Sequence, residues 1–310
     1  MINNLMKQEQ VPILVTWDVD PDIHIAYEAR ARSFDATIDL CHDLGIQSTF
    51  FITANADHIS PQHVERMLGN GQEVGCHGLT HGGEEDYDRM SAATQRTYIE
   101  EATHKLERLV GGPILSFRSP RVKTSAQTLR LLSEYGYLSD SSVCSQRVDF
   151  VSSNLINKGW IFAPRRSYHP HRDDAFKRGD LPIWEIPVSA MVVPFISTSL
   201  RVLGLTFMKA FFRLLHAESS RCNGKPIVYL THPTEFTGGK PQRRIKRKYF
   251  SPSYIRTHGF IARHWLCRMD GATCLKATRE LLGYMASFPD VTFMTVNQYV
   301  TQHLNAHLPL

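Results

Sequence analysis

Short apolar runs alternate with amphipathic stretches along the whole 310-residue chain. The runs are as long as strands, whereas the stretches between them repeat apolar residues every three or four positions, as helices do. Strands that alternate with helices favour a parallel sheet with right-handed crossovers. We predict strands over residues 11–16, 49–53, 73–76, 114–117, 137–139, 160–163, 183–188, 226–231 and 291–296, and helices over residues 33–44, 61–68, 91–110, 125–135, 199–217, 271–287 and 297–304.

Seven or eight such units predict an α/β fold, a distorted (β/α) barrel rather than an open sheet. A barrel gathers the residues that follow its strands at one mouth, and polar residues follow several of these strands. No internal repeat or linker divides the chain. We therefore expect residues 1–10 to be an N-terminal extension and residues 11–310 to be one domain. The polar stretch 141–181 is expected to form loops over the barrel mouth.

The positive net charge of +5 is unevenly distributed along the chain. Residues 237–268 contain nine Lys and Arg but no Asp or Glu, together with several aromatic residues, so the rest of the chain is slightly acidic. We call residues 237–268 the basic aromatic segment. No DNA- or RNA-binding motif accompanies it, so no nucleic acid is expected as a partner. A non-enzymatic protein that binds nucleic acid or membranes through this segment is the alternative from another class.

The sequence also bears on location. It has no run of about 20 apolar residues that would span a membrane. Its first apolar run is strand-length and ends in acidic residues, unlike a secretory signal. These features predict a cytoplasmic protein, and the basic aromatic segment suggests peripheral contact with the inner face of the membrane.

Candidate chemistry lies where the predicted strands end. Two carboxylates, two residues apart, follow the first strand, and two histidines, four apart, follow the third. An arginine follows the fourth strand, and a histidine follows the strand over residues 226–231. The residues are Asp18, Asp20, His77, His81, Arg118 and His232.

These residue types together suit metal-assisted hydrolysis of an amide or ester. One carboxylate and two histidines form a three-ligand set that leaves a position open on Zn²⁺ or a similar cation. A second carboxylate can take a proton from water, and a histidine opposite can protonate the leaving group. An arginine beside the base holds it ionised and aimed. Each element alone is weak evidence, but their order and shared position make the combination specific.

The sequence resembles the polysaccharide deacetylases of the NodB-homology group, carbohydrate esterase family 4. The resemblance covers about residues 11–304 and lies in Thr16-Trp17-Asp18-Val19-Asp20, which matches the D-x-D branch. It continues in His77-Gly78-Leu79-Thr80-His81, in Arg118-Ser119-Pro120 and in Leu230-Thr231-His232. It implies a distorted (β/α) barrel. It also implies that Asp18 is the catalytic base and that Asp20, His77 and His81 bind a divalent metal, Zn²⁺ first, with Co²⁺, Ni²⁺ and Fe²⁺ as alternatives.

The same resemblance assigns roles around these residues. Arg118 would pair with Asp18, His232 would be the general acid, and Leu230 would line the pocket for the acyl methyl group. The backbone amide of Arg121 would help to bind the oxyanion.

Two departures from the family pattern stand out. Gly78 replaces the usual Ser or Thr, which removes a loop-stabilising hydroxyl but no ligand. The family's fourth motif, D-x-x-D-W, is absent. Trp184 and Glu185 occupy its region, where Glu185 would orient His232 and Trp184 would wall the pocket.

The function implied by the resemblance is removal of an N-acyl group, acetyl in the first instance, from an amino sugar. For a cytoplasmic enzyme we expect a nucleotide-linked or lipid-linked sugar precursor rather than a finished wall polymer. An amidohydrolase of the same fold that acts on a non-sugar amide or a formyl group is the alternative within the family.

Overall fold

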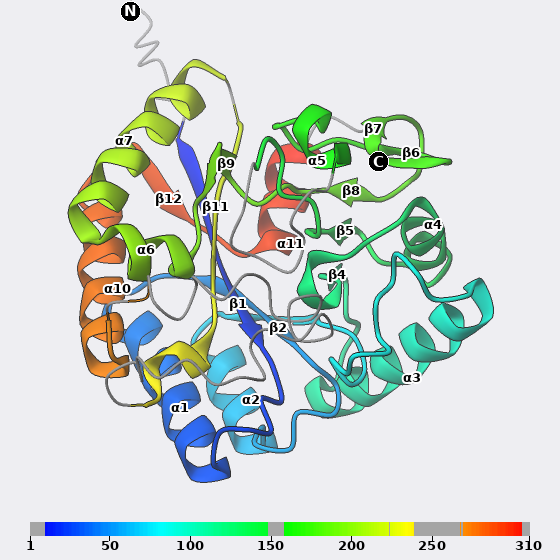
Figure 1. Cartoon of the computed structure of the whole chain (residues 1–310), viewed down its shortest axis with the longest axis horizontal. Helices are drawn as coiled ribbons and strands as arrows, with labels where there is room; N and C mark the ends of the chain where they lie inside the picture. The colour runs from blue at the N-terminus through cyan, green and yellow to red at the C-terminus, as the bar shows by residue number, and fades with distance from the viewer. Residues whose placement is uncertain (1–9, 148–157, 223, 239–266, 268, 306–310) are drawn as a thin grey trace, which may run out of the picture.

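The structure is a computed structural model that describes residues 10–147, 158–222, 224–238, 267 and 269–305. Its main sheet has eight strands in the order β11-β1-β2-β3-β4-β5-β8, with β12 also paired to β1. Every ladder in this sheet is parallel. The sheet curls into a half-barrel with helices around its outside (Figure 1). The predicted α/β fold of the deacetylase barrel type is confirmed.

The strands begin where the apolar pattern places them, but several are shorter than predicted. β1 is the longest and is buried along its whole length. The strands of the main sheet are β1 (Val11–Val19), β2 (Ser48–Ile52), β3 (Glu73–Cys76), β4 (Ser116–Phe117), β5 (Ser139–Asp140), β8 (Trp184–Glu185), β11 (Ile227–Thr231) and β12 (Val291–Phe293). Two short antiparallel pairs lie outside it: β6 (Pro170–His171) with β7 (Asp174–Arg178), and β9 (Ala190–Met191) with β10 (Val193–Pro194).

The helices start at polar caps that the sequence supplies. Ser60, Ser91, Ser125 and Asp270 each accept a hydrogen bond from a backbone amide in the first turn of their helix. The helices are α1 (Tyr27–Asp43), α2 (Pro61–Gly69), α3 (Ala92–Val110), α4 (Ala126–Glu134), α5 (Lys158–Phe162), α6 (Ser197–Leu203), α7 (Leu205–Arg221), α10 (Gly271–Ala286) and α11 (Val296–Tyr299). Short 3-10 turns follow β4 and β11: η1 (Pro120–Val122) and η2 (Pro233–Phe236).

The sheet is apolar on both faces, as parallel sheets are when helices cover them. Alternate residues of β1, such as Val15 and Trp17, pack outward in a cluster shared with α1, α3, α7 and α10. Leu14 of β1 and Phe51 of β2 face the barrel interior, in a second cluster that also contains Trp160 and Tyr299. The polar residues of the site lie at the end of this interior where the parallel strands finish.

Several predicted elements differ from the observed ones; α1, for example, begins at Tyr27, six residues before the helix predicted over residues 33–44. Residues 160–163, predicted as a strand, lie mostly in the helix α5, which buries Trp160. The helix predicted over residues 199–217 is two helices, because Gly204 between them has a φ of +87°. The strand predicted over residues 291–296 ends at Phe293, since Thr295 and Gln298 form a capping box that starts α11.

The stretch 141–181 is also more structured than predicted. Val143, Cys144, Trp160 and Ala163 are buried and belong to the interior cluster. The serines among them are buried as well, because their hydroxyls and backbone groups are hydrogen-bonded. The described part of this stretch is therefore partly loop and partly regular structure, in α5, β6 and β7, and its place over the mouth stays a prediction.

Nearly all of the basic aromatic segment lies outside the described residues, as does most of the predicted N-terminal extension. The expectation of one domain over residues 11–310 stays a prediction. Among the described helices, none combines the length and the apolar character that crossing a bilayer requires.

Gly75 of β3 shows how closely the interior is packed. A Cβ atom at this position would lie 2.7 Å from Cδ1 of Phe51 and 3.0 Å from the backbone oxygen of Ser116. Phe51 is fully buried and cannot swing away. Gly75→Ala should therefore lower the free energy of unfolding by about 1–3 kcal/mol, the usual cost of overpacking.

Denaturant unfolding measures this change. Gly112→Ala is the matched control, since a Cβ atom there meets nothing within 4 Å. It should alter the free energy of unfolding by no more than about 0.5 kcal/mol. Equal effects of the two substitutions would contradict the packing described for β3.

Candidate metal centre

Four strands deliver the candidate residues to one end of the barrel. β1 lies between β11 and β2, with Trp17 opposite both Thr231 and Phe50. β3 and β4 follow β2 in the sheet. Since all of these strands are parallel, the residues at their carboxyl ends meet at the same edge. Asp20, His77, Arg118 and His232 each come one residue after their strand.

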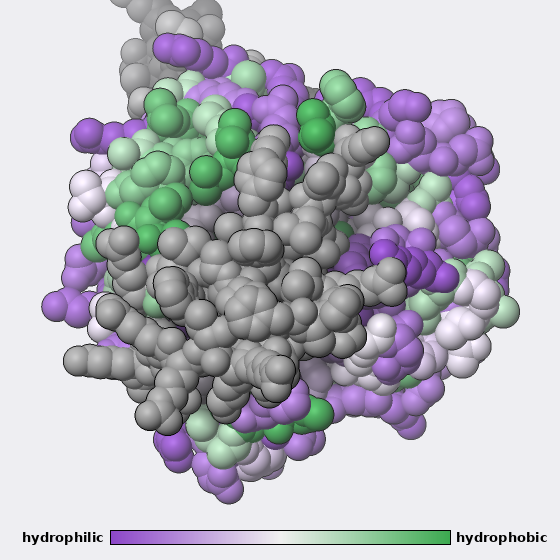
Figure 2. Space-filling model, viewed as in Figure 1, coloured by the Kyte–Doolittle hydropathy of each residue, from purple (hydrophilic) through white to green (hydrophobic). Residues whose placement is uncertain are grey.

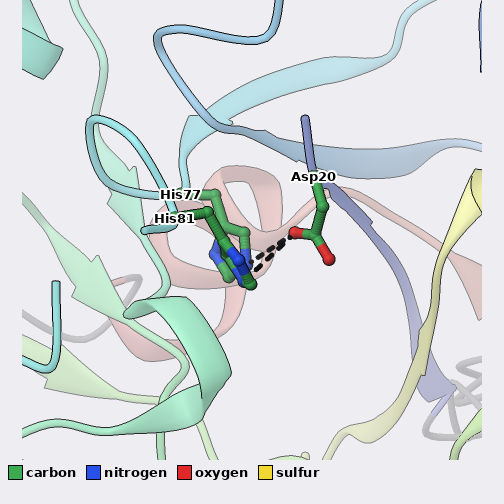
Figure 3. Close-up of side chains that lie close together, drawn as sticks. All are labelled: Asp20, His77 and His81. Carbon is green, nitrogen blue, oxygen red and sulfur yellow. Dashed lines mark ion pairs between the residues drawn. The ribbon is translucent and has the colours of Figure 1, made fainter. Parts of the chain in front are cut away.

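Asp20, His77 and His81 converge on one point (Figure 3). Oδ1 of Asp20 lies 3.4 Å from Nε2 of His77 and 3.4 Å from Nε2 of His81. One potential ligand atom from each residue lies within 4.8 Å of the other two, and this is the group that could hold a metal ion among the described residues. His81 adopts a left-handed backbone conformation, with a φ of +56°.

The donor atoms suit a divalent cation. Nδ1 of His77 lies 2.8 Å from the backbone oxygen of Arg118. A backbone oxygen can only accept, so Nδ1 carries the proton and Nε2 presents its lone pair toward Asp20. Oδ1 of Asp20 is buried without a hydrogen-bond partner among the described residues. A buried carboxylate oxygen in that state costs free energy unless a ligand satisfies it, so the three residues fit a bound metal.

The electrostatics of the three residues follow from their closeness. Burial opposes ionisation of Asp20, but the histidines, His81 foremost, hold the pKa of its carboxyl well below the usual range. The pKa of His81 is lowered, because burial opposes the positive charge of its protonated ring. Burial would lower the pKa of His77 too, yet the carboxylates of Asp18 and Asp20 raise it overall. The carboxyl of Asp20 therefore stays ionised between the two imidazoles, and an anionic oxygen there favours a cation.

Asp18 lies beside this group and forms a buried ion pair with Arg118. Nη1 of Arg118 donates to Oδ1 of Asp18 at 2.7 Å, and the guanidinium is completely buried. The other oxygen of Asp18, Oδ2, lies 3.8 Å from Nε2 of His77. The structure therefore brings the predicted base, its arginine and the predicted ligands together.

His232 approaches the oxygen of Asp20 that the other two histidines do not approach. Its Nε2 atom is 4.0 Å from Oδ2 of Asp20, and about a quarter of its side chain is exposed. Its Nδ1 atom is buried without a hydrogen-bond partner among the described residues. His232 can therefore reach a ligand at the mouth, although no described group orients its ring.

Leu230 belongs to the apolar interior next to the site, whereas Arg121 binds the backbone of the loop that carries His81. Leu230 is buried at the end of the interior cluster, opposite Thr16 of β1. The side chain of Arg121 donates to the backbone oxygens of His81, Gly82 and Glu85 and to Asp86. Arg121 thus holds the loop that carries His81. The oxyanion role of its backbone amide stays a prediction.

The two residues expected in place of the fourth motif have other partners. Oε1 of Glu185 accepts from the amide of Val143, and its carboxyl is hydrogen-bonded to Asp140, its register partner on β5. These contacts, rather than His232, account for the position of Glu185. Nε1 of Trp184 donates to Asn305, and its ring centroid lies 3.7 Å from that of His169. Trp184 is thereby tied to the C-terminal part of the described chain.

Several residues that support the site were not predicted from the sequence. Ser141 accepts two hydrogen bonds from Arg118, one on its backbone oxygen and one on its hydroxyl. Phe51 lies under the same guanidinium, 4.4 Å from it. Glu85 accepts the amides of the loop between the two histidine ligands. The run of acids after His81 is a signal for Glu85, but Ser141 and Phe51 have none of their own.

The Asp140–Glu185 pair provides a pH-dependent test of these contacts. Two carboxyls can hydrogen-bond to each other only when one holds a proton, and burial raises the pKa of both, Glu185 most. The folded protein therefore binds more protons than the unfolded chain above about pH 4, so the pair's contribution to stability falls as pH rises. In Glu185→Gln the amide can donate to Asp140 without a titrating proton.

We therefore expect Glu185→Gln to become more stable relative to wild type as pH rises. Between pH 5 and pH 8 the difference in unfolding free energy should shift in favour of the variant by roughly 1–3 kcal/mol, since one pKa unit is worth about 1.4 kcal/mol. Denaturant unfolding at the two pH values measures it. A difference that does not change with pH would contradict a shared proton.

Comparison with known proteins agrees with this architecture. Residues 6–139 match the family model described as polysaccharide deacetylase. A peptidoglycan deacetylase-like protein of Gibberella zeae is 26% identical over 95 residues, which make up 31% of this chain and only 27% of that protein. The family model covers the part of the chain that holds Asp18, Asp20, His77, His81 and Arg118.

Similarity in structure extends over the whole chain. A Mycobacterium smegmatis protein named for the same family has a TM-score of 0.63 at 15% identity, with 96% of this chain and 91% of that one covered. Puue allantoinase has a TM-score of 0.62 at 14% identity, with 98% and 93% covered. At such identities the likeness shows the fold. Together with the sequence match over residues 6–139, it confirms that the chain resembles the polysaccharide deacetylases.

Proposed function

We propose that this protein is a metal-dependent hydrolase that removes the N-acetyl group from an amino sugar. The observation that carries the proposal is the meeting of Asp20, His77 and His81 beside the buried Asp18–Arg118 pair. This set contains a cation site and a proton acceptor on one edge of the barrel. The family match over residues 6–139 supports a carbohydrate as the substrate.

Asp20, His77 and His81 would hold the metal, and Zn²⁺ is the first choice for one oxygen and two nitrogen ligands. The donor set also suits Co²⁺, Ni²⁺ and Fe²⁺. When bound, such an ion activates water and polarises the carbonyl of the acyl group.

Asp18 is suited to accept the proton of the attacking water. Arg118 holds Oδ1 of Asp18, which leaves Oδ2, on the side of His77, to take the proton. The arginine cannot lose its own proton, so it keeps Asp18 in place and ionised before each turnover.

His232 is suited to donate a proton to the leaving amine. Its Nε2 atom lies near Oδ2 of Asp20, whereas His77 and His81 approach Oδ1, and its side chain is partly exposed, so a substrate at the mouth can reach it. Leu230, two residues before it in the chain and buried, gives the acetyl methyl group an apolar surface. A base that takes a proton from water and an acid that gives one to the leaving amine allow attack and departure without free ions in solution.

The proposed activity leaves open which molecule carries the acyl group. We favour a nucleotide- or lipid-linked amino sugar over a finished polymer, and the alternative is a non-sugar amide or a formyl group. A screen of N-acetylated and N-formylated sugar nucleotides, glycolipids and small ureides, read by mass loss, separates these substrates. Loss of an acyl mass from a ureide alone would overturn the carbohydrate assignment.

The expected membrane contact stays a prediction. Most of the basic aromatic segment lies outside the described residues. Among the described residues, Leu203 of α6 and Phe207 and Leu214 of α7 are exposed large apolar side chains. An apolar patch over α6 and α7 is visible in Figure 2. Arg201 of α6 and Lys209 and Arg213 of α7 are basic residues of the same helices. An apolar helix face with basic residues beside it suits the surface of an anionic bilayer.

The metal assignment predicts that His77→Ala loses bound metal and activity together. Removal of one of three ligands leaves a carboxylate and a single imidazole, which hold a divalent ion weakly. Metal content of the purified variant measures the loss. His104→Ala is the control, because His104 is an exposed histidine on α3. If His77→Ala kept one equivalent of metal, these ligands would be wrongly assigned.

The proton-transfer roles predict a different outcome for two other variants. Asp18→Asn and His232→Ala should keep the metal but reduce kcat by roughly 10²–10⁴-fold each, the usual contribution of a general acid or base. Metal analysis of the same preparations serves as the internal control. Turnover close to that of the wild type in both variants would exclude this mechanism.

A further inference from the structure

The loop between the two histidine ligands wraps around a single buried carboxylate. Glu85 is completely buried. It accepts hydrogen bonds from the backbone amides of Leu79, Thr80 and His81, each at 2.7 Å. The hydroxyls of Thr80 and Tyr87 donate to it as well, at 3.0 and 3.1 Å. Three successive amides that point at one anion form a nest, so the loop is folded around the charge of Glu85.

The absence of a side chain at Gly78 makes room for the carboxylate of Glu85. The family pattern has Ser or Thr at this position, whose hydroxyl stabilises the loop. Gly78 has a φ of +76°, and a Cβ atom on it would lie 2.5 Å from Oε1 of Glu85 and 2.8 Å from Cγ of Pro120. A side chain at residue 78 and the carboxylate of Glu85 therefore cannot occupy this loop together. Gly78 therefore leaves free the space that the carboxylate of Glu85 occupies.

The contact reaches the metal centre directly through His81. This residue holds a φ of +56°, a conformation that costs a residue with a side chain about 1–2 kcal/mol. Its own amide donates to Glu85, and its backbone oxygen accepts from Arg121. Both sides of the peptide backbone at His81 are thus fixed, and this orientation aims Nε2 at Asp20.

We propose that Glu85 is a positioning residue of the metal centre, which fixes His81 by binding the amides of residues 79–81. The expected effect of Glu85 on metal binding rests on the proposed metal site. The hydrogen bonds between Glu85 and the loop do not depend on that proposal. The ability of this carboxylate to accept hydrogen bonds is the essential property, because its hydrogen-bond partners among the described residues are all donors. A neutral amide of the same size would turn an N–H group toward those donors.

The metal affinity of two variants tests this idea. Glu85→Gln keeps the shape but loses acceptor capacity, whereas Glu85→Asp keeps the anion on a shorter side chain. The dissociation constant for Zn²⁺, measured by chelator competition well below the unfolding temperature, should rise about 10–100-fold in Glu85→Gln, as for other groups that orient ligands. Glu85→Asp should retain tighter binding than Glu85→Gln. If Glu85 only filled space, Glu85→Gln would bind Zn²⁺ more tightly than Glu85→Asp, because Gln has the same size and shape as Glu.

Glu84→Gln is the matched control for charge. Glu84 is the preceding residue, is exposed, and accepts a hydrogen bond from the hydroxyl of Thr80 rather than from a backbone amide of residues 79–81. It should bind Zn²⁺ as the wild type does. Wild-type affinity in Glu85→Gln, or an equal loss in Glu84→Gln, would overturn the proposal.

Hydrogen exchange of the metal-free protein separates this proposal from the metal site itself. In the wild type, the amides of residues 79–81 should exchange slowly, with the amide of Thr53, bonded to the backbone oxygen of Val19, as reference. In a folded Glu85→Gln variant these three amides should lose protection while Thr53 keeps it. Fast exchange in the wild type overturns the role of Glu85 even if no variant folds. Slow exchange in a wild type that binds no Zn²⁺ would instead overturn the proposed function.

Discussion

The ion pair between Arg118 and Asp18 is the constraint on which the rest of the site depends. A guanidinium that is completely buried must have its N–H groups satisfied, because an unpaired buried charge is very costly. Arg118 donates to Asp18, to the hydroxyl of Thr16, and twice to Ser141. Removal of one partner from such a pair typically costs about 3–5 kcal/mol. The barrel interior must therefore keep these acceptors in place.

This requirement explains the polar residues that interrupt an otherwise apolar interior. Ser141 and its neighbour Ser142 are buried because the first binds Arg118 and the second accepts the amide of Ser119. Ser142 in turn donates to Asp140, whose register partner on β8 is Glu185. One network thus links the base at the mouth to β5 and β8. The described contacts of Glu185 belong to this network.

The candidate site was predictable because its residues lie at the ends of apolar runs that predict strands. Asp18, His77, Arg118 and His232 follow recognisable apolar runs, and a parallel sheet brings such ends together. The supporting groups were not predictable in the same way. Ser141 meets Arg118 across 23 residues, and Phe51 reaches it from another strand. Likewise β4, β5 and β8 pair over two residues each, too few to give a periodic signal, and α5 reads as a strand by its apolar run alone.

A buried carboxylate and a partly buried guanidinium stabilise the irregular backbone next to the site. Glu85, an acceptor only, binds the amides of the loop after His77, whereas Arg121, a donor only, binds the backbone oxygens of the same loop. Neither side chain can exchange its role with the other, so the loop has a unique arrangement of its peptide groups. A regular strand would satisfy these groups by itself but would hold His77 and His81 apart along its length. The left-handed conformation of His81 is therefore maintained by its neighbours, and the geometry of the candidate metal centre follows from them.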